Sequence, residues 1–355
     1  MVSEEPIDVI CNKEQTKNCA VRLGRVFCDG FNPDGLIGAF SHFHQDHIHA
    51  ITDCIGQYDT IITHPITLEA ITAMDSGFRH REQWVTQDYD TRYHCPAGDI
   101  RLLKANHIPG SAQIHVESDG RSMLYSGDFN YPDIQIREAD FLVLDSTHGD
   151  PIFDGSTDRK SVKNRMFEDI KEKMDSNKPV IVQAYSGTLQ EIIKHFEINY
   201  DGSKLSHDIP FVTTKSQKEI LFRIYKNEKN EFREILDYDE HEFWRLVRGN
   251  KRCIIFLPYN TIVDSSLQNY FRIRVDRYRF ASEEPAITSS SDGMRYNLAA
   301  HASIQNIISF IKEVKPKTLV TDMSRSGYAP QLAKIIHQSF PEINCYSRPN
   351  FKKYV

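Results

Sequence analysis

The stretch Ser41-His42-Phe43-His44-Gln45-Asp46-His47 places four ligand-type side chains within six residues. His42 and His44 alternate, so both imidazoles project from one side of an extended segment. Asp46 and His47 then stand at the turn into a helix expected from Ile48. Buried imidazoles and carboxylates must be paired or bound to a cation, and they are the ligands that suit zinc in a catalytic site with an open position. The stretch therefore predicts a metal site, and a chance cluster on a solvated loop is the alternative.

Two later motifs resemble the completion of such a site. Residues 105–111, Ala-Asn-His-Ile-Pro-Gly-Ser, put His107 after a strand and inside a Pro-Gly turn. Residues 125–129, Tyr-Ser-Gly-Asp-Phe, put Asp128 after another strand. Loops at strand ends are where functional sites are assembled. Each residue alone fits an ordinary turn equally well, but their order after the histidine cluster predicts that both are ligands.

The hydrophobic periodicity divides the chain into three stretches. The first 150 residues contain short strands at close spacing, which is typical of a β-sandwich. From about residue 155 helices and buried strands alternate, residues 215–244 are predicted to be mostly helical, and residues 289–293 look like a turn-rich hinge. Apolar runs predict strands over residues 36–40, 59–62, 100–105, 114–117, 123–125, 141–144, 180–182 and 318–321, and helical periodicity predicts helices over residues 161–174, 188–196, 303–314 and 331–339.

The overall charge of the chain does not indicate a nucleic-acid-binding protein. The 355 residues carry 43 Lys and Arg against 49 Asp and Glu, for a formal net charge of −6, whereas nucleic-acid binding usually needs a basic face. A local basic strand is nevertheless predicted over residues 271–280, with a solvated edge strand as the alternative. Its alternating arginines are Arg272, Arg274, Arg277 and Arg279.

The cysteines and the apolar runs bear on the cellular setting. The seven cysteines are scattered without a CxxC pair, which indicates a reducing compartment and small core residues. No run approaches the roughly 20 apolar residues of a membrane span, and the first residues are not a signal peptide. We therefore expect an intracellular chain without a membrane partner, cytoplasmic in a prokaryote and nuclear in a eukaryote.

The motifs HxHxDH, NHxPGS and SGDF, in this order, resemble those of the β-CASP group of metallo-β-lactamase nucleases. Residues 144–151, Leu-Asp-Ser-Thr-His-Gly-Asp-Pro, add a fourth match, and the similarity is greatest to the DNA-repair branch that includes Artemis and Apollo. The resemblance implies an α/β (α+β) fold, with a metallo-β-lactamase αββα sandwich and an inserted β-CASP α/β domain. The implied domains are residues 1–155, the insertion 156–288, and residues 289–355, which return to the sandwich.

The resemblance also implies which residues bind metal. The first zinc ion would lie among His42, His44 and His107, with Asp128 bridging to a second, more weakly held divalent ion. The second ion would be held by Asp46, His47 and Asp128. Asp29 matches the family's early aspartate, which orients the ligands from behind, whereas Asp145 is expected to be structural.

Further implied residues lie beyond the sandwich. Glu191 matches an acidic residue of the insertion, and His301 matches a histidine near the scissile phosphate. With Asp46 and Asp128 these two complete the implied catalytic set.

Nucleic-acid contacts are expected from Tyr185 and Ser186, with Tyr185 available for stacking on bases. The DNA-repair branch has a lysine where this chain has Gln190, so a tight pocket for a terminal 5′-phosphate is in doubt.

One position bears on the substrate. Met323 stands where RNA-processing members have a histidine, which favours DNA, while residues 146–150 are close to the STYGD of RNA-processing members. The resulting hypothesis is a zinc-dependent phosphodiesterase that cleaves DNA as a 5′–3′ exonuclease in repair or processing, through in-line attack of an activated water. The alternative is an RNA-processing ribonuclease, endonucleolytic or 5′–3′ exonucleolytic. A small-molecule hydrolase and a non-catalytic scaffold remain as other classes, and protein partners are unknown.

Overall fold

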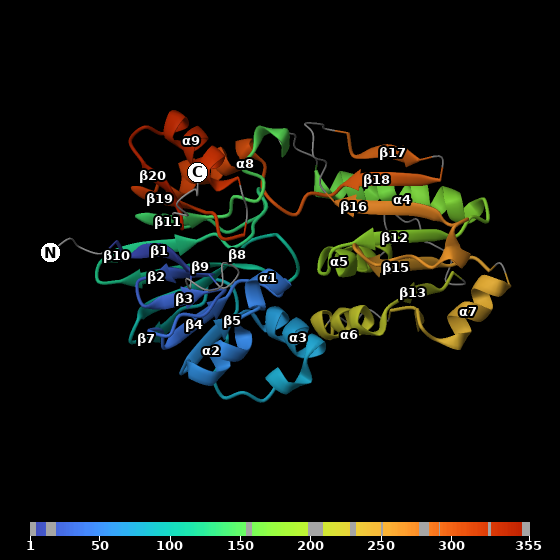
Figure 1. Ribbon diagram of the computed structural model, residues 1–355, viewed down its shortest axis with the longest axis horizontal. Helices are drawn as coiled ribbons and strands as arrows, with labels where there is room; N and C mark the ends of the chain where they lie inside the picture. The colour runs from blue at the N-terminus through green and yellow to red at the C-terminus, as the bar shows by residue number, and fades with distance from the viewer. Residues whose placement is uncertain are drawn as a thin grey trace, which may run out of the picture. The chain divides into compact units, whose positions relative to one another are not determined.

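The structure is a computed structural model of the chain. It describes residues 5–11, 19–153, 158–197, 209–227, 232–249, 251–276, 284–290, 292–325 and 328–349. The chain divides into two compact units, the first comprising Met1–Asp154 with His301–Val355 and the second Gly155–Ala300. Each unit has its own sheets and helices (Figure 1).

The first unit contains two sheets that pack face to face. One has the strand order β1-β2-β3-β4-β5-β6 and the other β20-β19-β11-β10-β9-β8-β7. The strands of the first sheet are β1 Ile7–Cys11, β2 Cys19–Leu23, β3 Val26–Cys28, β4 Ile37–Phe40, β5 Thr60–Thr63 and β6 Trp84–Thr86. Those of the second are β7 Tyr93–Cys95, β8 Gly98–Lys104, β9 Ala112–Ser118, β10 Arg121–Tyr125, β11 Phe141–Leu144, β19 Thr318–Asp322 and β20 Asn344–Arg348. Side chains of both sheets, such as Val21 and Ile114, share one buried cluster.

Helices complete the first unit as an αββα sandwich. They are α1 Gln45–Ile48, α2 Ile51–Gln57, α3 Pro65–Met74, α8 Ile304–Val314 and α9 Ala329–Ser339, with the 3-10 turns Ser76–Phe78 and Pro151–Phe153. Helix α8 begins where Ser303 accepts a hydrogen bond from the Asn306 amide, a favourable N-cap. Its apolar residues recur every three or four positions, so Ile307 and Phe310 face the second sheet and are buried there with α9. The two C-terminal helices predicted from periodicity are thereby confirmed.

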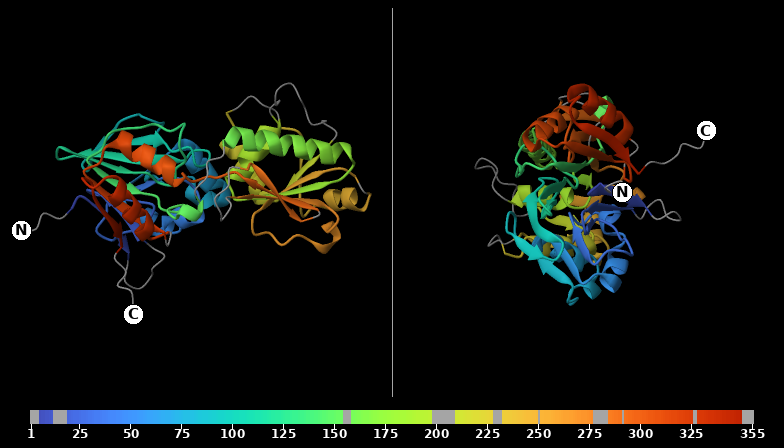
Figure 2. Two further views of the ribbon diagram at one scale, coloured as in Figure 1. Left: turned by 90° about the horizontal axis from the view of Figure 1, so that it is seen from above. Right: turned by 90° about the vertical axis from the view of Figure 1, so that its left-hand side faces the viewer.

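The second unit is a single sheet of the order β14-β13-β15-β12-β16-β18-β17, parallel except for its last pair. Its strands are β12 Val180–Ala184, β13 Phe211–Thr213, β14 Ile235–Asp237, β15 Ile254–Pro258, β16 Phe271–Asp276, β17 Ala286–Ser290 and β18 Gly293–Asn297. Its helices are α4 Arg159–Asp175, α5 Thr188–Glu197, α6 Lys215–Ile224 and α7 His241–Arg248, with a 3-10 turn at Ser265–Leu267. The left view of Figure 2 shows α4 running along the sheet.

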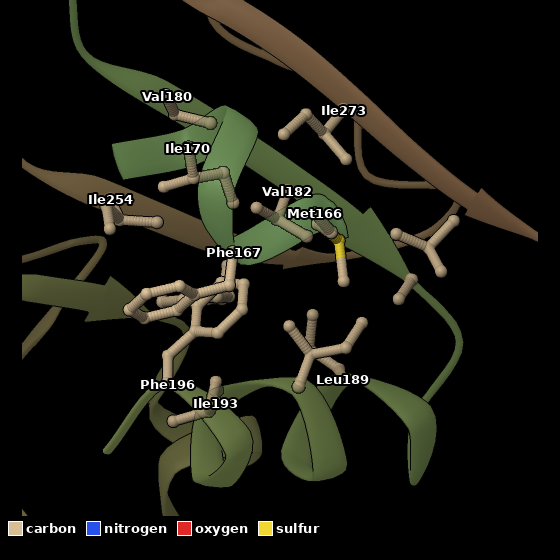
Figure 3. Packing of buried hydrophobic residues seen from close by; sticks show 14 of the residues in the cluster. Met166, Phe167, Ile170, Val180, Val182, Leu189, Ile193, Phe196, Ile254 and Ile273 are labelled. Carbon is tan, nitrogen blue, oxygen red and sulfur yellow. The ribbon is translucent and has the colours of Figure 1, made fainter. Parts of the chain in front are cut away.

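The core of the second unit is built between the sheet and the helices α4 and α5. Phe167 of α4 and Phe196 of α5 meet at 5.6 Å between ring centroids, and Figure 3 shows them in one cluster with strand residues such as Val182. A fully buried side chain of this size stabilises the fold by about 1.5–3 kcal/mol. The uninterrupted apolar run Val180–Ile181–Val182 is expected for a parallel strand covered on both faces, and all three residues are buried.

Two expectations need correction. The helical stretch predicted over residues 215–244 is interrupted, because β14 separates α6 from α7 and extends the sheet beside β13. The charged residues of this stretch gave no strand signal for β14, which has three residues and is stabilised by its pairing with β13. The second unit also extends to Ala300, beyond the expected boundary at residue 288. The turn-rich segment there connects β17 to β18, in which Ser290 lies opposite Gly293, so its composition indicates a hairpin rather than a hinge.

The cysteines also differ from expectation. Cys11 and Cys19 form a disulfide, while five others are free thiols. Their spacing of eight residues carries no recognisable motif, but the β1–β2 register places them directly opposite each other. Separately, among the described residues, no helix has both the length and the apolar composition that crossing a membrane requires.

Candidate metal centre

The candidate site is assembled at strand ends of the first unit. Asp29 directly follows β3 and His42 comes two residues after β4, which pairs with β3 in parallel. Asp128 comes three residues after β10, and Asp145 directly follows β11, its parallel neighbour. Because carboxyl ends of neighbouring parallel strands lie at one edge of a sheet, residues distant in sequence meet there.

Four donor atoms gather where these edges of the two sheets meet. His44 Nδ1 lies 3.0 Å from His42 Nε2 and 3.1 Å from His107 Nε2. Asp128 Oδ2 lies 3.6 Å from His42 Nε2 and 3.5 Å from His107 Nε2. A tetrahedral zinc ion with bonds of 2.0–2.1 Å needs ligand atoms roughly 3.3 Å apart. The four predicted ligands therefore fit a tetrahedral ion in both chemistry and spacing.

A second corner surrounds His47. Its Nε2 atom lies 3.3 Å from Asp128 Oδ1 and 3.5 Å from Asp46 Oδ2, and it is buried without a hydrogen-bond partner among the described residues. Asp46 itself is 63% exposed. Among the described residues, three groups of side chains could each hold a metal ion. They are His42, His44, His107 and Asp128; Asp29, His42 and His47; and Asp128, Asp145 and His301. Asp46 belongs to none of them, so the set predicted for a second ion is less complete than the first.

The Asp29 carboxylate makes hydrogen bonds to several residues next to the candidate ligands. Its carboxylate accepts hydrogen bonds from the Ser41 amide at 2.7 Å, the Ser41 hydroxyl at 2.5 Å and the Tyr125 hydroxyl at 3.1 Å. It also contacts His47 Nδ1 at 2.7 Å, which turns Nε2 of that ring toward Asp46 and Asp128. Burial alone would raise the pKa of Asp29, but His47, Arg325 and Ser41 together lower it. The geometry supports the orienting role expected for this residue.

The protonation state of His42 suits metal binding by the four-donor set. Burial, followed by the nearby His47 and His44, holds the pKa of His42 well below its usual range, so its imidazole is neutral as a ligand must be. Burial would also lower the pKa of His47, but Asp128 and Asp29 raise it to about 10. A cation that binds His47 therefore has to displace a proton.

His301 and Asp145 form a pair beside the donor cluster. His301 Nδ1 lies 2.8 Å from Asp145 Oδ2, and its Nε2 lies 3.8 Å from Asp128 Oδ2. Burial would lower the pKa of His301, but Asp145 and Asp128 raise it to about 9. The ring is therefore cationic at neutral pH and can donate a proton or stabilise an anionic oxygen. Asp145, expected to be structural, holds this ring in place.

Gly127 is needed to place Asp128. Its backbone has a φ of +53°, and an added Cβ would lie 2.9 Å from the Ser41 Cβ and 3.0 Å from the Ala112 carbonyl oxygen. A side chain therefore has no room, and the left-handed backbone is unfavourable for any residue but glycine. The SGDF motif thus combines a tight turn with a candidate ligand.

Glu191 of the second unit lies between two cations. Its carboxylate contacts the Arg159 guanidinium at 2.5 Å and the Lys163 amine at 2.6 Å. Burial would raise the pKa of Glu191, but Arg159 and Lys163 lower it. Both of its oxygens are thus engaged by basic side chains of α4, and its catalytic role stays a prediction.

Gln190 stands where the DNA-repair branch has a lysine, and its hydrogen bonds show what it does there. Gln190 is buried, accepts a hydrogen bond from the Gly187 amide at 2.7 Å and donates to Gln217 Oε1 at 2.7 Å. Ser186 also donates to Gln217 Oε1, at 3.1 Å. Tyr185 is 51% exposed and stacks on Tyr259, with ring centroids 4.6 Å apart. Its predicted contact with a base remains open, whereas Gln190 acts within the loop.

The predicted basic strand is present in part. Arg272 and Arg274 are exposed along β16 and alternate with buried apolar residues, and the Arg274 guanidinium lies 5.6 Å from the Tyr259 ring centroid. Arg277 and Arg279 lie outside the described residues. The nucleic-acid contacts of all four arginines stay predictions.

Three contributors escaped sequence reasoning. Ser41 precedes the histidines and its residue type alone predicts no role, although its hydroxyl contacts both Asp29 and His42 Nδ1. Tyr125 carried only a strand signal. Arg325 carried none, since nothing in its neighbourhood shows that it returns to Asp29, 296 residues away.

Three curated proteins are similar to this chain in sequence. No protein-family model matches the chain. It is 29% identical over 211 residues to the RNase J-like protein of Methanocaldococcus jannaschii, an alignment that covers 53% of this chain and 49% of that protein. It is 27% identical over 243 residues to RNase aCSPSF2 of Saccharolobus solfataricus, covering 58% and 48%. The Integrator complex subunit 11 of Gallus gallus is 20% identical over 303 residues, covering 71% and 49%.

The chain spans about half the length of the curated relatives it matches. Among solved structures it resembles a protein of unknown function from Enterococcus faecalis V583, with a TM-score of 0.53 and 12% identity over 84% of this chain and 78% of that one. That likeness concerns the fold alone. The chain is therefore an α/β protein with the metallo-β-lactamase sandwich and a β-CASP insertion, similar in sequence to proteins named as ribonucleases, with buried His and Asp clusters that could hold metal ions.

Proposed function

We propose that the chain is a zinc-dependent ribonuclease that hydrolyses phosphodiester bonds. The observation that carries this proposal is the convergence of the four-donor cluster with His301 on Asp128, whose Oδ2 atom lies 3.5 Å from His107 Nε2 and 3.8 Å from His301 Nε2. A cation site with a protonated imidazole at its edge suits the displacement of an oxygen from a phosphate, because negative charge develops on both the non-bridging and the leaving oxygens.

The protein's own residues supply binding, orientation and a proton. His42, His44, His107 and Asp128 would hold a zinc ion, which supplies positive charge and lowers the pKa of a coordinated water. Asp145 holds His301 by a 2.8 Å contact and keeps it protonated. His301 then donates its Nε2 proton to the leaving oxygen, or stabilises the charge there. Asp29 keeps His47 from rotating through its 2.7 Å contact with Nδ1.

RNA is the substrate that the sequence relatives favour. Two of the three are named as RNases, and residues 146–150 of this chain are close to the STYGD of RNA-processing members. This supports the ribonuclease alternative over the DNA hypothesis. Met323 is the observation on the other side, since RNA-processing members have a histidine there, so DNA is retained as the second candidate.

The test compares matched substrates. Single-stranded RNA and DNA of one sequence, labelled at the 5′ end, are incubated with the wild-type chain, with Asp128→Asn, and with Asp99→Asn as a control. Asp99 is bound by Arg92 and His94 and belongs to none of the donor groups in the described residues. We expect RNA cleavage by the wild type and the control, and a loss on the order of 10²–10³-fold or more in Asp128→Asn.

Three outcomes would change the proposal. Faster cleavage of DNA than of RNA would establish the second candidate. Equal activity of Asp128→Asn would remove the site assignment altogether. Release of labelled mononucleotides would support the predicted 5′–3′ exonuclease, whereas internal fragments would indicate an endonuclease.

The ligand types predict which metal ion binds, and elemental analysis tests that prediction. Three imidazoles and one carboxylate suit zinc better than magnesium or calcium, which prefer oxygen ligands. Elemental analysis of the purified chain is expected to find zinc. A preparation that is fully active after reconstitution with magnesium alone would contradict this assignment.

A further inference from the structure

Arg325 lies beside the second corner of the metal centre. It comes three residues after the end of β19, in the part of the first unit that follows the insertion. Its Nη2 donates to the Asp29 carbonyl at 2.7 Å and its Nε to the Asp46 carbonyl at 3.3 Å. Its Nη1 donates to Asp322 Oδ2 at 2.9 Å and Ser324 Oγ at 3.1 Å. The guanidinium therefore ties β19 to the two turns that carry Asp29 and Asp46.

The side chain is largely buried and permanently charged. Only 11% of it is exposed, and Tyr125, Asp322, Asp29 and Asp46 raise its pKa even though burial opposes this. A guanidinium does not lose its proton in a protein. Its field acts on His47 as well, since Arg325 is among the charges that lower the pKa of that imidazole.

The same corner lacks a complete ligand set. His47 Nε2 has two carboxylates within 3.5 Å, yet Asp46 joins no group of three donors in the described chain. Met323, at the position where RNA-processing members have a histidine, offers a thioether, which suits softer metals than a divalent ion held by oxygen and imidazole. A second divalent ion would thus meet few ligands and one fixed positive charge.

We propose that Arg325 supplies the permanent positive charge of the second cation position, so that this chain binds one metal ion and not two. The ion occupies the His42, His44, His107 and Asp128 set. Arg325 has a second effect as a positioning residue, because its bonds to two carbonyls fix the turns that begin at Asp29 and Asp46. The inference rests on the metal centre and not on the nature of the nucleic acid.

The experiment counts metal ions. The full chain is stripped with a chelator, reconstituted with excess zinc, freed of unbound metal and analysed for zinc per chain, with affinities from competition with a chromogenic chelator. Four variants are compared with the wild type. They are Arg325→Lys, Arg325→Gln, Asp46→Asn and the control Arg348→Gln, whose side chain contacts only Asp8, at 3.7 Å, among the ion pairs of the described residues.

The positive charge of Arg325 and its hydrogen bonds predict different results in the variants. We expect one ion per chain in the wild type, in Arg348→Gln and in Arg325→Lys, which keeps the charge but loses most of the hydrogen bonds and melts at a lower temperature. Arg325→Gln is expected to take up a second, weaker ion. Asp46→Asn is expected to stay at one ion with unchanged affinity, because Asp46 is not a ligand of the single ion.

Each contrary result overturns the proposal. Two tight ions in the wild type would show that Arg325 does not fill the position, and one ion in a folded Arg325→Gln would show that its charge does not exclude a second. Should Arg325→Gln fail to fold, the wild-type count and Asp46→Asn decide, since a loss of zinc from Asp46→Asn would make Asp46 a ligand. The counts stand apart from activity, so an inactive chain with one ion would refute the ribonuclease proposal alone.

Discussion

Asp29 shows how much one buried carboxylate can organise. It receives the Ser41 amide and hydroxyl, the Tyr125 hydroxyl and His47 Nδ1, while its own carbonyl accepts from Arg325. These contacts join residues that lie up to 296 positions apart in the chain. Asp29 reaches this position with a φ of +51°, a backbone conformation that aspartate tolerates better than most residues.

Replacing Asp29 with Asn is therefore expected to weaken both metal binding and stability. The amide nitrogen cannot accept a hydrogen bond, so at least one of the buried donors loses its partner, at a cost of about 2–4 kcal/mol in the free energy of unfolding. Zinc affinity should fall roughly 10–100-fold, as is usual when the residue behind a ligand is changed. Competition titration and chemical denaturation measure the two effects. Asp8→Asn, on β1, is the matched control, and an equal loss in that variant would contradict the argument.

His115 provides a pH dependence away from the metal centre. It is fully buried on β9 with Nε2 2.8 Å from Ser122 Oγ, and burial, aided by Arg137 and Arg101, lowers its pKa to about 4. The unfolded chain takes up a proton near pH 6.5 and the folded chain does not until about pH 4. Stability is therefore intact above pH 6.5 and is lost as the pH falls from 6.5 to 4, by about 2 kcal/mol at pH 5.

The measurement compares wild type with His115→Gln at pH 7 and pH 5. The variant is expected to lose less stability over this interval than the wild type, by that amount, because glutamine does not titrate. Identical losses in the two proteins would mean that His115 is protonated equally in the folded and unfolded states. Other histidines titrate in both proteins and cancel in the difference.

At the scale of elements, helix α4 positions the cations that hold Glu191. It begins where Asp158 accepts a hydrogen bond from the Ser161 amide at 2.7 Å, and its first turns carry Arg159 and Lys163. The helix buries Phe167 and Ile170 against the sheet (Figure 3). A loss at its N-terminus therefore affects both the core of the second unit and the ion pairs.

Asp158→Ala is expected to destabilise the second unit by about 1 kcal/mol, because the amide of the first turn loses its partner. Asp158→Asn keeps an oxygen in the same place and should lose much less. Denaturant unfolding followed by tryptophan fluorescence compares them, since Trp244 lies on α7 of this unit. Equal losses in Ala and Asn would show that the charge at the helix terminus matters and the hydrogen bond does not.

The elements also show where periodicity succeeds and fails. Helices α8 and α9 were predictable because each has an apolar stripe that its own sequence displays. The three residues of β14 were not, because a strand this short exists only through its pairing with β13, and pairing joins residues that the sequence keeps apart.

At the scale of the whole molecule, the two units have separate hydrophobic cores. They also differ in whether they carry groups that could bind a metal ion. Every donor group found in the described residues belongs to the first unit, and none to the second. A ligand stabilises only the part that binds it, in proportion to the logarithm of its concentration over the dissociation constant.

Chelation is therefore expected to lower the melting temperature of the first unit and to leave that of the second in place. With zinc at about 100 times its dissociation constant, the shift should be about 5–10 °C for a unit of this size. Calorimetry with and without a chelator measures it. A single transition that moves as a whole would show that the units unfold together, and no shift at all would contradict metal binding.

The sequence by itself predicted the candidate ligands and their order along the chain, and it determined the fold class. Three histidines and an aspartate in short motifs have few chemical uses other than a metal site, and the alternation of apolar residues is set by the backbone of each strand or helix. Only the tertiary structure showed that Asp145 holds His301, that Cys11 faces Cys19, and that Arg325 lies beside Asp46. The physical reason is that such contacts depend on which strands become neighbours, and that choice is made by packing over the whole chain and not by any local stretch of sequence.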